Sequence, residues 1–275
     1  MNEQVERDVM EYDVLIIGGG PSGLSSAIKV KQLASAEGKD VSVCVLEKGS
    51  EIGAHILSGN VFEPTALNEL IPDWKEKEAP LNSPATKDIV KFMISENSSF
   101  NIPFPSFLIP TFNNHGNYVM SLANFTRWLA TQAESLGVEI FPGFTAAEVI
   151  FEENVVKGVL TGEMGISKDG EKKPSYQPSM ELRGKYTVFA EGCRGHLGKQ
   201  LIKKFNLDEN RDPQHYGIGF KEIWDISPED HKEGTVMHTM GWPSNGTISG
   251  SYFYHGENNQ VYFCLLYTSD AADDP

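Results

Sequence analysis

The feature that most constrains the fold of this chain is a glycine-rich segment near its start, residues 12–24 (YDVLIIGGGPSGL). The apolar run Val14–Ile17 is short and ends at a glycine, which is typical of a buried strand in a parallel sheet. The next glycines, Gly18, Gly20 and Gly23, complete the pattern G-x-G-x-x-G. In this pattern the first glycine permits a tight turn, and the second lets the backbone approach a pyrophosphate. The third lets the following helix pack closely on the strand.

The sequence around this pattern supplies the other parts of a β-α-β unit. Helical spacing predicts a helix that ends at Gly38, with its apolar side formed by Leu24, Ala27, Ile28, Leu33 and Ala34. A second predicted strand, residues 41–48, carries Glu47, whose carboxylate can accept hydrogen bonds from the hydroxyls of an adenosine ribose. The alternative is a glycine-rich turn in an ordinary α/β protein, with Glu47 solvated. Because strand, turn, helix, strand and acid occur in order, we predict a dinucleotide site, to which Ser22 and Lys48 also belong.

Charge and composition exclude several classes of protein. The net charge of -15 argues against nucleic acid as a ligand and against simple adsorption to anionic lipid. The three cysteines, Cys44, Cys193 and Cys264, are far apart, so we expect neither a disulfide framework nor a C-x-x-C metal site. Cys44 is best interpreted as a small hydrophobic residue inside a strand. No apolar run approaches the roughly 20 residues of a membrane-spanning helix. The first eleven residues resemble neither a secretory nor a transit peptide, so we expect a cytoplasmic start.

A glycine-containing loop follows the second predicted strand and leads to a short predicted helix, residues 64–70. Such a loop leaves the carboxyl end of the strand, where ligands bind in open α/β sheets. His55 and Ser58, between Gly53 and Gly59, are therefore candidates for positions near the reactive ring of the cofactor. The alternative is that His55 is a surface residue and Ser58 only stabilises the turn.

Two segments with unusual composition come next. Residues 73–98 are rich in charge and predict a peripheral excursion. Residues 99–112 (SFNIPFPSFLIPTF) carry no charge and three prolines, which exclude a helix and disfavour a central strand. Two interpretations of this apolar segment are open. It is either a loop that covers the core, or an apolar mouth that admits a lipophilic substrate or dips into a bilayer.

The middle of the chain predicts a helix, a strand and a hairpin. Ser121 is a suitable N-cap and Gly137 a suitable stop for an amphipathic helix whose apolar stripe is Leu122, Phe125, Leu129, Ala133 and Leu136. Arg127 lies off this stripe and contacts either a cofactor phosphate or solvent. A strand over VEIF and two strands around a turn at Glu153 and Asn154 follow, so that a hairpin joins the parallel sheet. We interpret residues 162–179 as a loop.

A second strand-turn-helix begins at Tyr186 and continues through Phe205. The strand ends on the small residue Ala190, and Glu191 and Gly192 form the turn, which would let a cofactor pass close to the backbone. An ordinary strand-turn-helix is the alternative. From Asp212 onward, aromatic strands separated by glycine turns predict an antiparallel layer suited to a substrate domain.

Taken together, these segments resemble the electron-transfer flavoprotein–ubiquinone oxidoreductase family, related to the FixC-type flavoproteins. The resemblance lies between residues 12 and 265, in the motifs GGGPSGLSSAI, VLEKGSEIGAHILSGNVFEP, NNHGNY, QAESLGVEIFPGF, FAEGCRGHLGKQLI, YGIGFKEIW and HTMGWP. It implies an α/β fold, with a Rossmann-like FAD-binding domain of the glutathione-reductase type and a β-rich ubiquinone domain. We expect the FAD-binding domain to comprise residues 1–78 and 118–205, and part of the ubiquinone domain to comprise 79–117 and 206–266.

The resemblance also implies a function. Members of the family accept electrons from reduced electron-transfer flavoprotein and pass them to membrane ubiquinone, using FAD and a [4Fe-4S] cluster. Carried onto this sequence, Gly18, Gly20 and Gly23 would hold the FAD pyrophosphate and Glu47 its ribose. The stretch from Gly53 to Gly59 would lie towards the flavin ring. Residues 190–192 would also line the cofactor, and the apolar segment 100–112 would contact the membrane or the quinone. We assign no catalytic side chain, because the flavin carries the redox chemistry.

The sequence departs from the family in length. Members are about twice as long, and their later half contains the cluster cysteines, the last flavin-contacting motif and much of the quinone site. None of the three cysteines here matches a cluster ligand, so this chain alone is expected to be incomplete. Residues 267–275 (YTSDAADDP) abandon the strand pattern, and we interpret them as a non-native tail from a truncation or joining error.

The short polar start resembles a bacterial member more than an organellar precursor. We therefore expect a peripheral protein on the cytoplasmic face of the bacterial inner membrane, or on the mitochondrial inner membrane if the source is eukaryotic. Two rival interpretations are open. One is another FAD enzyme of this fold, such as a monooxygenase or a prenyl-lipid reductase. The other is an inactive fragment that only binds FAD.

Overall fold

The computed structural model describes residues 7–57, 59–103, 112–213, 217–243 and 249–268. The chain divides into two compact units, one from residues 1–56 and 126–210 and the other from 57–125 and 211–275. Residues 57–78 and 118–125, which we had assigned to the FAD-binding domain, therefore group with the second unit. The assignment of FAD to one unit and ubiquinone to the other stays a prediction.

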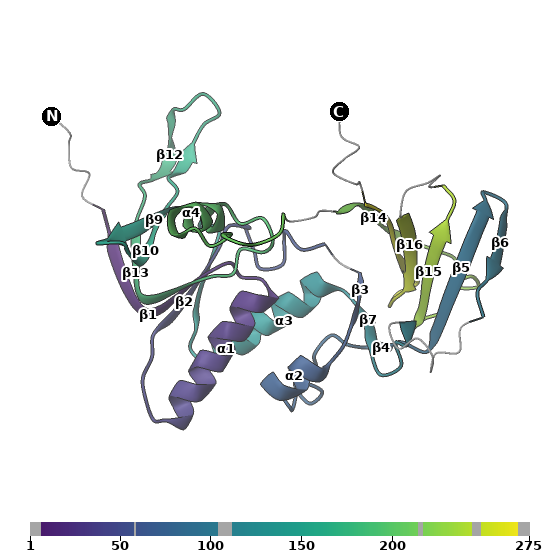
Figure 1. Ribbon diagram of the computed structural model, residues 1–275. Helices are drawn as coiled ribbons and strands as arrows, with labels where there is room; N and C mark the ends of the chain where they lie inside the picture. Colours follow the sequence, from purple (N-terminus) through teal and green to yellow (C-terminus); the bar gives the residue numbers. More distant parts are fainter. Residues whose placement is uncertain (1–6, 58, 104–111, 214–216, 244–248, 269–275) are drawn as a thin grey trace. The chain divides into compact units, whose positions relative to one another are not determined.

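The first unit is built on a six-stranded sheet with the order β8-β2-β1-β13-β10-β9 (Figure 1). Its strands are β1 (Val9–Ile17), β2 (Val43–Glu47), β8 (Glu139–Pro142), β9 (Ala146–Glu152), β10 (Val155–Thr161) and β13 (Glu181–Phe189). Strands β8, β2, β1 and β13 are parallel, so their carboxyl ends lie at one edge of the sheet. Strands β9 and β10 form the predicted hairpin, and Glu153 and Asn154 at its turn have φ of 46° and 70°.

Three helices were predicted for this part of the chain and all three form: α1 (Pro21–Ala36), α3 (Leu122–Ser135) and α4 (His196–Phe205). The predicted N-cap of α3 is confirmed, because the Ser121 hydroxyl accepts a hydrogen bond from the Asn124 N–H at 3.3 Å. Two positions predicted on apolar helix faces are exposed instead. Leu33 in α1 is 54% exposed, although the next residue, Ala34, is buried, and Leu136, just after α3, is 38% exposed.

A buried cluster in the core of the first unit combines side chains distant in sequence. It contains Tyr12, Leu15, Ile17, Cys44, Leu46, Ala146, Val159, Leu182 and Leu197. Cys44 is fully buried, and burial raises the pKa of its thiol to about 12. It packs as a small hydrophobic residue, as predicted.

The second unit is built on another six-stranded sheet, with the order β14-β17-β16-β15-β5-β6. Its strands are β5 (Lys87–Ser95), β6 (Ser98–Asn101), β14 (Gly217–Asp225), β15 (Thr235–Gly241), β16 (Ser249–His255) and β17 (Gln260–Thr268). The predicted antiparallel layer after Asp212 is confirmed. The interpretation of residues 73–98 as a peripheral excursion was wrong, because β5 pairs with β15 in parallel and buries Val90 in the sheet.

A small three-stranded sheet accompanies the larger one in the second unit. It consists of β3 (Asn60–Phe62), β7 (Tyr118–Met120) and β4 (Ser83–Pro84), and the predicted short helix is α2 (Thr65–Leu70). A buried cluster joins the two sheets, with Val119 of β7, Val236 of β15, Tyr254 of β16, Tyr262 of β17 and Ala85. The small sheet therefore covers part of one face of the large sheet.

Three further expectations are modified. Residues 162–179 are not only a loop, because β11 (Met164–Ile166) pairs with β12 (Lys172–Gln177). Strand β17 continues through Tyr267 and Thr268, so the strand pattern is not abandoned at Tyr267, and residues 269–275 lie outside the described part. Of the apolar segment, residues 99–101 belong to the edge strand β6, and 104–111 lie outside the described residues.

Within the described ranges, no helix is long and apolar enough to cross a membrane.

Candidate dinucleotide site

The glycine-rich turn sits where β1 and β13 end side by side. Gly18 has a φ of +110°, and a Cβ atom there would lie 2.4 Å from the backbone oxygen of Ala190. The Ala190 N–H in turn donates a hydrogen bond to the Ile17 oxygen at 2.8 Å. Gly18 is therefore required by both its conformation and the close approach of the Ala190 backbone. The two strand-turn segments that the sequence analysis identified therefore lie side by side, at the carboxyl ends of β1 and β13.

The other two glycines of the fingerprint have different surroundings. A Cβ at Gly23 would lie 2.0 Å from the Gly18 oxygen, so Gly23 is what lets α1 pack against the turn. At Gly20, by contrast, a Cβ would meet nothing within 4 Å. Gly20 is the N-cap of α1, whose first turn has Pro21 and no acidic side chain. The open space at Gly20 thus adjoins a helix N-terminus, which favours an anionic group such as a pyrophosphate.

The Glu47 carboxylate accepts hydrogen bonds from two turns, the glycine-rich turn after β1 and the turn that follows β2. Its Oε2 accepts a hydrogen bond from the Gly19 N–H at 2.9 Å, and its Oε1 accepts one from the Gly49 N–H at 2.7 Å. A carboxylate oxygen can accept more than one hydrogen bond, so both oxygens keep capacity for a ligand hydroxyl. The side chain is half-buried, whereas the neighbouring Lys48 is exposed. Glu47 is thereby held in position at the carboxyl end of β2.

The stretch from Gly53 to Gly59 is divided between the two units. Gly53 is buried with a φ of +83°, and His55 is exposed, in the first unit. Ser58 lies outside the described residues. Gly59 belongs to the second unit, where a Cβ would lie 2.4 Å from the Cγ of Tyr262. Gly59 thus has a packing role that sequence reasoning missed, because its partner is some 200 residues away in the chain.

Arg127 of α3 makes an ion pair that was not predicted. Its guanidinium lies 3.1 Å from Oε1 of Glu51, in the loop that follows β2, and both side chains are largely exposed. An exposed pair of this kind contributes little to stability. Ser22, in the first turn of α1, is also exposed. Both candidate residues are therefore reachable from solvent in the first unit.

Glu191 caps a helix. Its Oε2 accepts a hydrogen bond from the Gly198 N–H at 2.8 Å and its Oε1 accepts one from the Leu197 N–H at 3.3 Å. His196 Nδ1 lies 3.4 Å from the same Oε1. These contacts satisfy the first N–H groups of α4, a use that the turn pattern alone did not predict. Gly192, with a φ of +79°, has open space around it.

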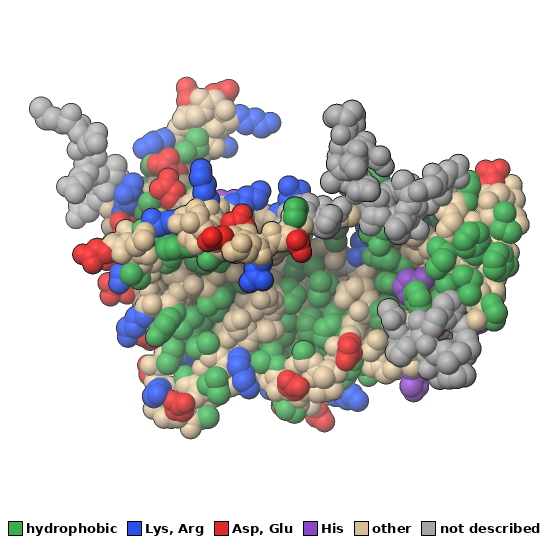
Figure 2. Space-filling view, in the orientation of Figure 1, with side chains coloured by type: hydrophobic (Ala, Val, Ile, Leu, Met, Phe, Trp, Pro, Cys, Tyr) green, Lys and Arg blue, Asp and Glu red, His purple; other side chains and the backbone are tan. Residues whose placement is uncertain are grey.

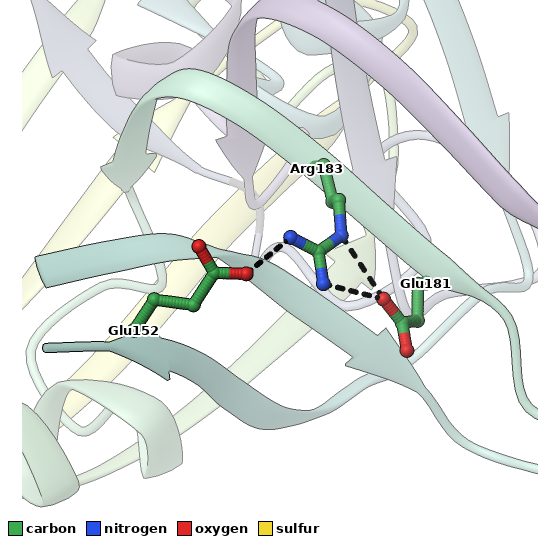
Figure 3. Close-up of polar contacts among 3 residues, drawn as sticks. All are labelled: Glu152, Glu181 and Arg183. Carbon is green, nitrogen blue, oxygen red and sulfur yellow. Dashed lines mark hydrogen bonds and ion pairs between the residues drawn. The ribbon is translucent and has the colours of Figure 1, made fainter.

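A charge cluster lies at the opposite end of β13 from this turn (Figure 3). Arg183 donates a hydrogen bond to Glu152 at 2.6 Å and another to Glu181 at 3.0 Å. The bond from Arg183 lowers the pKa of the Glu152 carboxyl. Because the cluster joins β9 to β13, we interpret it as a structural contact and not as part of the cofactor site.

The second unit contains a cavity of about 120 Å³. It is lined by Pro80, Val119, Met120, Ser121, Asn124, Ile223, Glu257, Asn258, Gln260 and Tyr262. The sequence did not predict this cavity, because its walls come from two segments about a hundred residues apart. Its lining combines apolar side chains with the amides of Asn124, Asn258 and Gln260.

Comparison with known proteins decides the family. Residues 16–71 match the model of an NAD(P)-binding Rossmann-like domain, and residues 216–273 match the model "ETF-QO, ubiquinone-binding". Electron transfer flavoprotein-ubiquinone oxidoreductase from Pseudomonas aeruginosa is 59% identical over 266 residues, which cover 95% of this chain and 48% of that protein. The chain belongs to the electron transfer flavoprotein-ubiquinone oxidoreductase family. The human mitochondrial member is 50% identical over 253 residues, or 91% of this chain and 40% of that protein. This family member thus spans about half the length of the curated relatives it matches.

Solved structures agree on the fold of this family member. A geranylgeranyl bacteriochlorophyll reductase-like protein from Thermoplasma acidophilum superposes with a TM-score of 0.64 at 16% identity, covering 94% of this chain and 57% of that one. The myxobacterial chondrochloren halogenase CndH, a FAD-dependent halogenase, gives a TM-score of 0.59 at 15% identity, covering 97% and 54%. At these identities the likeness concerns the fold alone. The predicted α/β class, with a Rossmann-like domain and a β-rich second domain, is confirmed.

Proposed function

We propose that the protein is a FAD-dependent oxidoreductase that passes electrons from reduced electron transfer flavoprotein to membrane ubiquinone. The observation that carries this proposal is the 59% identity, over 95% of the chain, to a protein named for that activity. The match of residues 216–273 to a ubiquinone-binding model supports ubiquinone as the acceptor. The solved structures of this fold are only 15–18% identical, so the alternative of another FAD enzyme, such as a monooxygenase or a prenyl-lipid reductase, is less favoured.

The residues of the first unit fit FAD. Open space at Gly20, next to the N-terminus of α1, would take the pyrophosphate, and the fixed carboxylate of Glu47 would take the adenosine ribose. The backbone of Ala190 and Gly192 would lie close to the cofactor. Arg127 is exposed, so its guanidinium could contact a phosphate of the cofactor. His55 would lie towards the ring, and the same role for Ser58, outside the described residues, rests on the family resemblance alone. Bound FAD would supply the redox chemistry, since a flavin can take up one electron at a time and store two, while these residues bind and orient it.

The residues present do not fit a [4Fe-4S] cluster. Such a cluster is held by four cysteine thiolates, whereas the chain has three cysteines. Cys44 and Cys264 are buried and Cys193 is exposed.

We also propose that the protein associates peripherally with a membrane, on the cytoplasmic face if bacterial and on the mitochondrial inner membrane if eukaryotic. Hydrophobic side chains gather over β15, β5 and β6 in the second unit (Figure 2). Among them Phe92, Ile94 and Phe100 are 38%, 60% and 52% exposed. An exposed apolar patch of this kind supports contact with lipid or a lipophilic quinone.

The absorption spectrum of the purified chain after gel filtration tests the proposal. We expect a flavin spectrum that co-elutes with the folded protein and shows no broad iron–sulfur absorbance. A folded, colourless protein that also fails to take up added FAD would contradict FAD binding by this chain.

A further inference from the structure

One face of the large sheet in the second unit carries a row of titratable side chains. The strand register places Lys221 of β14 opposite Cys264 of β17, Cys264 opposite Tyr252 of β16, and Tyr252 opposite His238 of β15. Paired residues of neighbouring antiparallel strands point to the same face, so these four side chains follow one line across the sheet. Tyr254 lies next along β16 on that face.

His238 and Tyr254 are directly connected. His238 Nε2 lies 3.0 Å from the Tyr254 hydroxyl, within hydrogen-bonding distance. The Tyr254 ring is stacked on Tyr252, with centroids 4.2 Å apart and planes 9° apart, which fixes the position of its hydroxyl. Tyr254 is 8% exposed and His238 is half-buried. The pair thus joins a buried hydroxyl to a group that reaches towards solvent.

The pair is separated from the cavity of the second unit by one side chain. Tyr262, which lines that cavity, is the register partner of Tyr254 and belongs to the same buried cluster. The cavity volume of about 120 Å³ is smaller than that of an engineered cavity known to admit a benzene ring, about 150 Å³. Both members of the pair also lie within residues 216–273, which match the ubiquinone-binding model.

We propose that His238 and Tyr254 deliver the protons that a quinone takes up when it is reduced at this face of the sheet. This inference rests on the proposed function, in which a quinone receives two electrons from the flavoprotein donor. Reduction to the quinol also requires two protons, one for each oxygen. In each transfer the Tyr254 O–H bond breaks as a quinone O–H bond forms, and the His238 Nε2–H proton restores the Tyr254 hydroxyl. His238 is then reprotonated from solvent, and Tyr254 stays neutral throughout.

The surroundings suit this direction of transfer. Burial lowers the pKa of His238, so its protonated form is a better acid than an ordinary imidazolium, although Asp88 of β5 opposes this shift. Burial raises the pKa of Tyr254 to about 12, so the hydroxyl keeps its proton at neutral pH. The other titratable groups that face the pair are Lys221, Tyr252, Tyr262 and Cys264. Histidine is the member of this set whose ordinary pKa lies nearest neutrality.

Pulse radiolysis of the 275-residue chain with bound ubiquinone-1, a short-chain soluble quinone, tests the proposal. Radicals from formate supply one electron to the quinone, and the absorbance of the anionic semiquinone reports its protonation, so FAD is not needed. At pH 6 we expect His238→Gln and Tyr254→Phe each to slow protonation at least about 100-fold, the lower end of the range for general acids. The matched control is His255→Gln, since His255 is the next residue of β16 and points to the other face, and its rate should stay within twofold.

Binding of ubiquinone-1, measured by fluorescence quenching, separates the possible failures. We expect both variants to bind it within twofold of the unaltered chain and to keep its melting temperature. Normal binding with unchanged protonation rates would overturn this inference and leave the proposed function standing. A parallel loss of binding and rate would also overturn it, because the pair would then only shape the pocket. If the unaltered chain bound no ubiquinone-1, the proposed function of this segment would fail, and the inference with it.

Discussion

The Gly19 N–H donates a hydrogen bond of 2.9 Å to Oε2 of Glu47, which joins the glycine-rich turn to the end of the neighbouring strand β2. The other oxygen of the same carboxylate accepts the Gly49 N–H at 2.7 Å. The acid expected to bind a ribose is therefore held by two backbone groups before any ligand arrives. Because this carboxylate is already ordered, ligand binding loses less side-chain entropy than it would with a free side chain.

Replacing Glu47 should weaken both folding and cofactor binding. Glu47→Ala leaves the Gly19 and Gly49 N–H groups without their acceptor, and we expect a loss of about 1–3 kcal/mol in the free energy of unfolding. FAD affinity should fall at least tenfold. Urea unfolding and a flavin fluorescence titration measure the two effects. Glu148→Ala, an exposed acid on β9, is the control and should change neither quantity appreciably. Unchanged FAD affinity in Glu47→Ala would contradict the ribose assignment.

Two glycines of the turn should respond to alanine in opposite ways. At Gly18 the new Cβ would lie 2.4 Å from the Ala190 oxygen, in a backbone conformation with φ of +110°. We expect Gly18→Ala to lower the free energy of unfolding by about 2–4 kcal/mol. At Gly20 the new Cβ enters open space, so Gly20→Ala should fold normally and lose FAD affinity. Denaturation midpoints measure the stability of the two variants, and FAD titrations measure their affinity. Full FAD affinity in Gly20→Ala would contradict the assignment of the pyrophosphate to the space at Gly20.

Asp13 should make stability depend on acid pH. A hydrogen bond from Lys185, at 2.6 Å, together with bonds from Ser42 lowers the pKa of Asp13 from 3.8 to about 2. Because the folded-state pKa is the lower one, its contribution is fully present above pH 3.8 and is lost as pH falls towards 2. Asp13→Asn should therefore be less stable than the parent at pH 6, with the difference shrinking between pH 4 and 2. Urea midpoints at pH 6, 4 and 3 measure this, and a difference independent of pH would contradict the assignment.

The three cysteines should differ in reactivity. Cys193 is exposed, whereas Cys264 is buried, and burial of Cys44 raises its pKa to about 12. Since the thiolate is the reactive form, we expect one thiol to react quickly with a disulfide reagent at pH 8 in the folded chain. All three should react in guanidinium chloride. Cys193→Ser should abolish the fast phase, and a fast phase that survived would mean that a buried thiol is reachable.

The sequence by itself determined the local elements. The order of strand, glycine turn, helix, strand and acid predicted β1, α1 and β2 with Glu47 at the end, because each depends on residues close together in the chain. The turn at Glu153 and Asn154 and the aromatic strands after Asp212 were predicted for the same reason. Predictions failed where segments carry a mixed pattern. The charge-rich composition of residues 73–98 concealed β5, in which Val90 is the one buried side chain.

The tertiary structure decided which distant residues meet. Local periodicity could not indicate that Arg127 pairs with Glu51 or that Gly59 packs on Tyr262. Nor could it place His238 of β15 against Tyr254 of β16. The physical reason is that hydrogen bonds and packing act over a few ångströms in space, whatever the separation along the chain. Only strand order and register bring such partners within that distance.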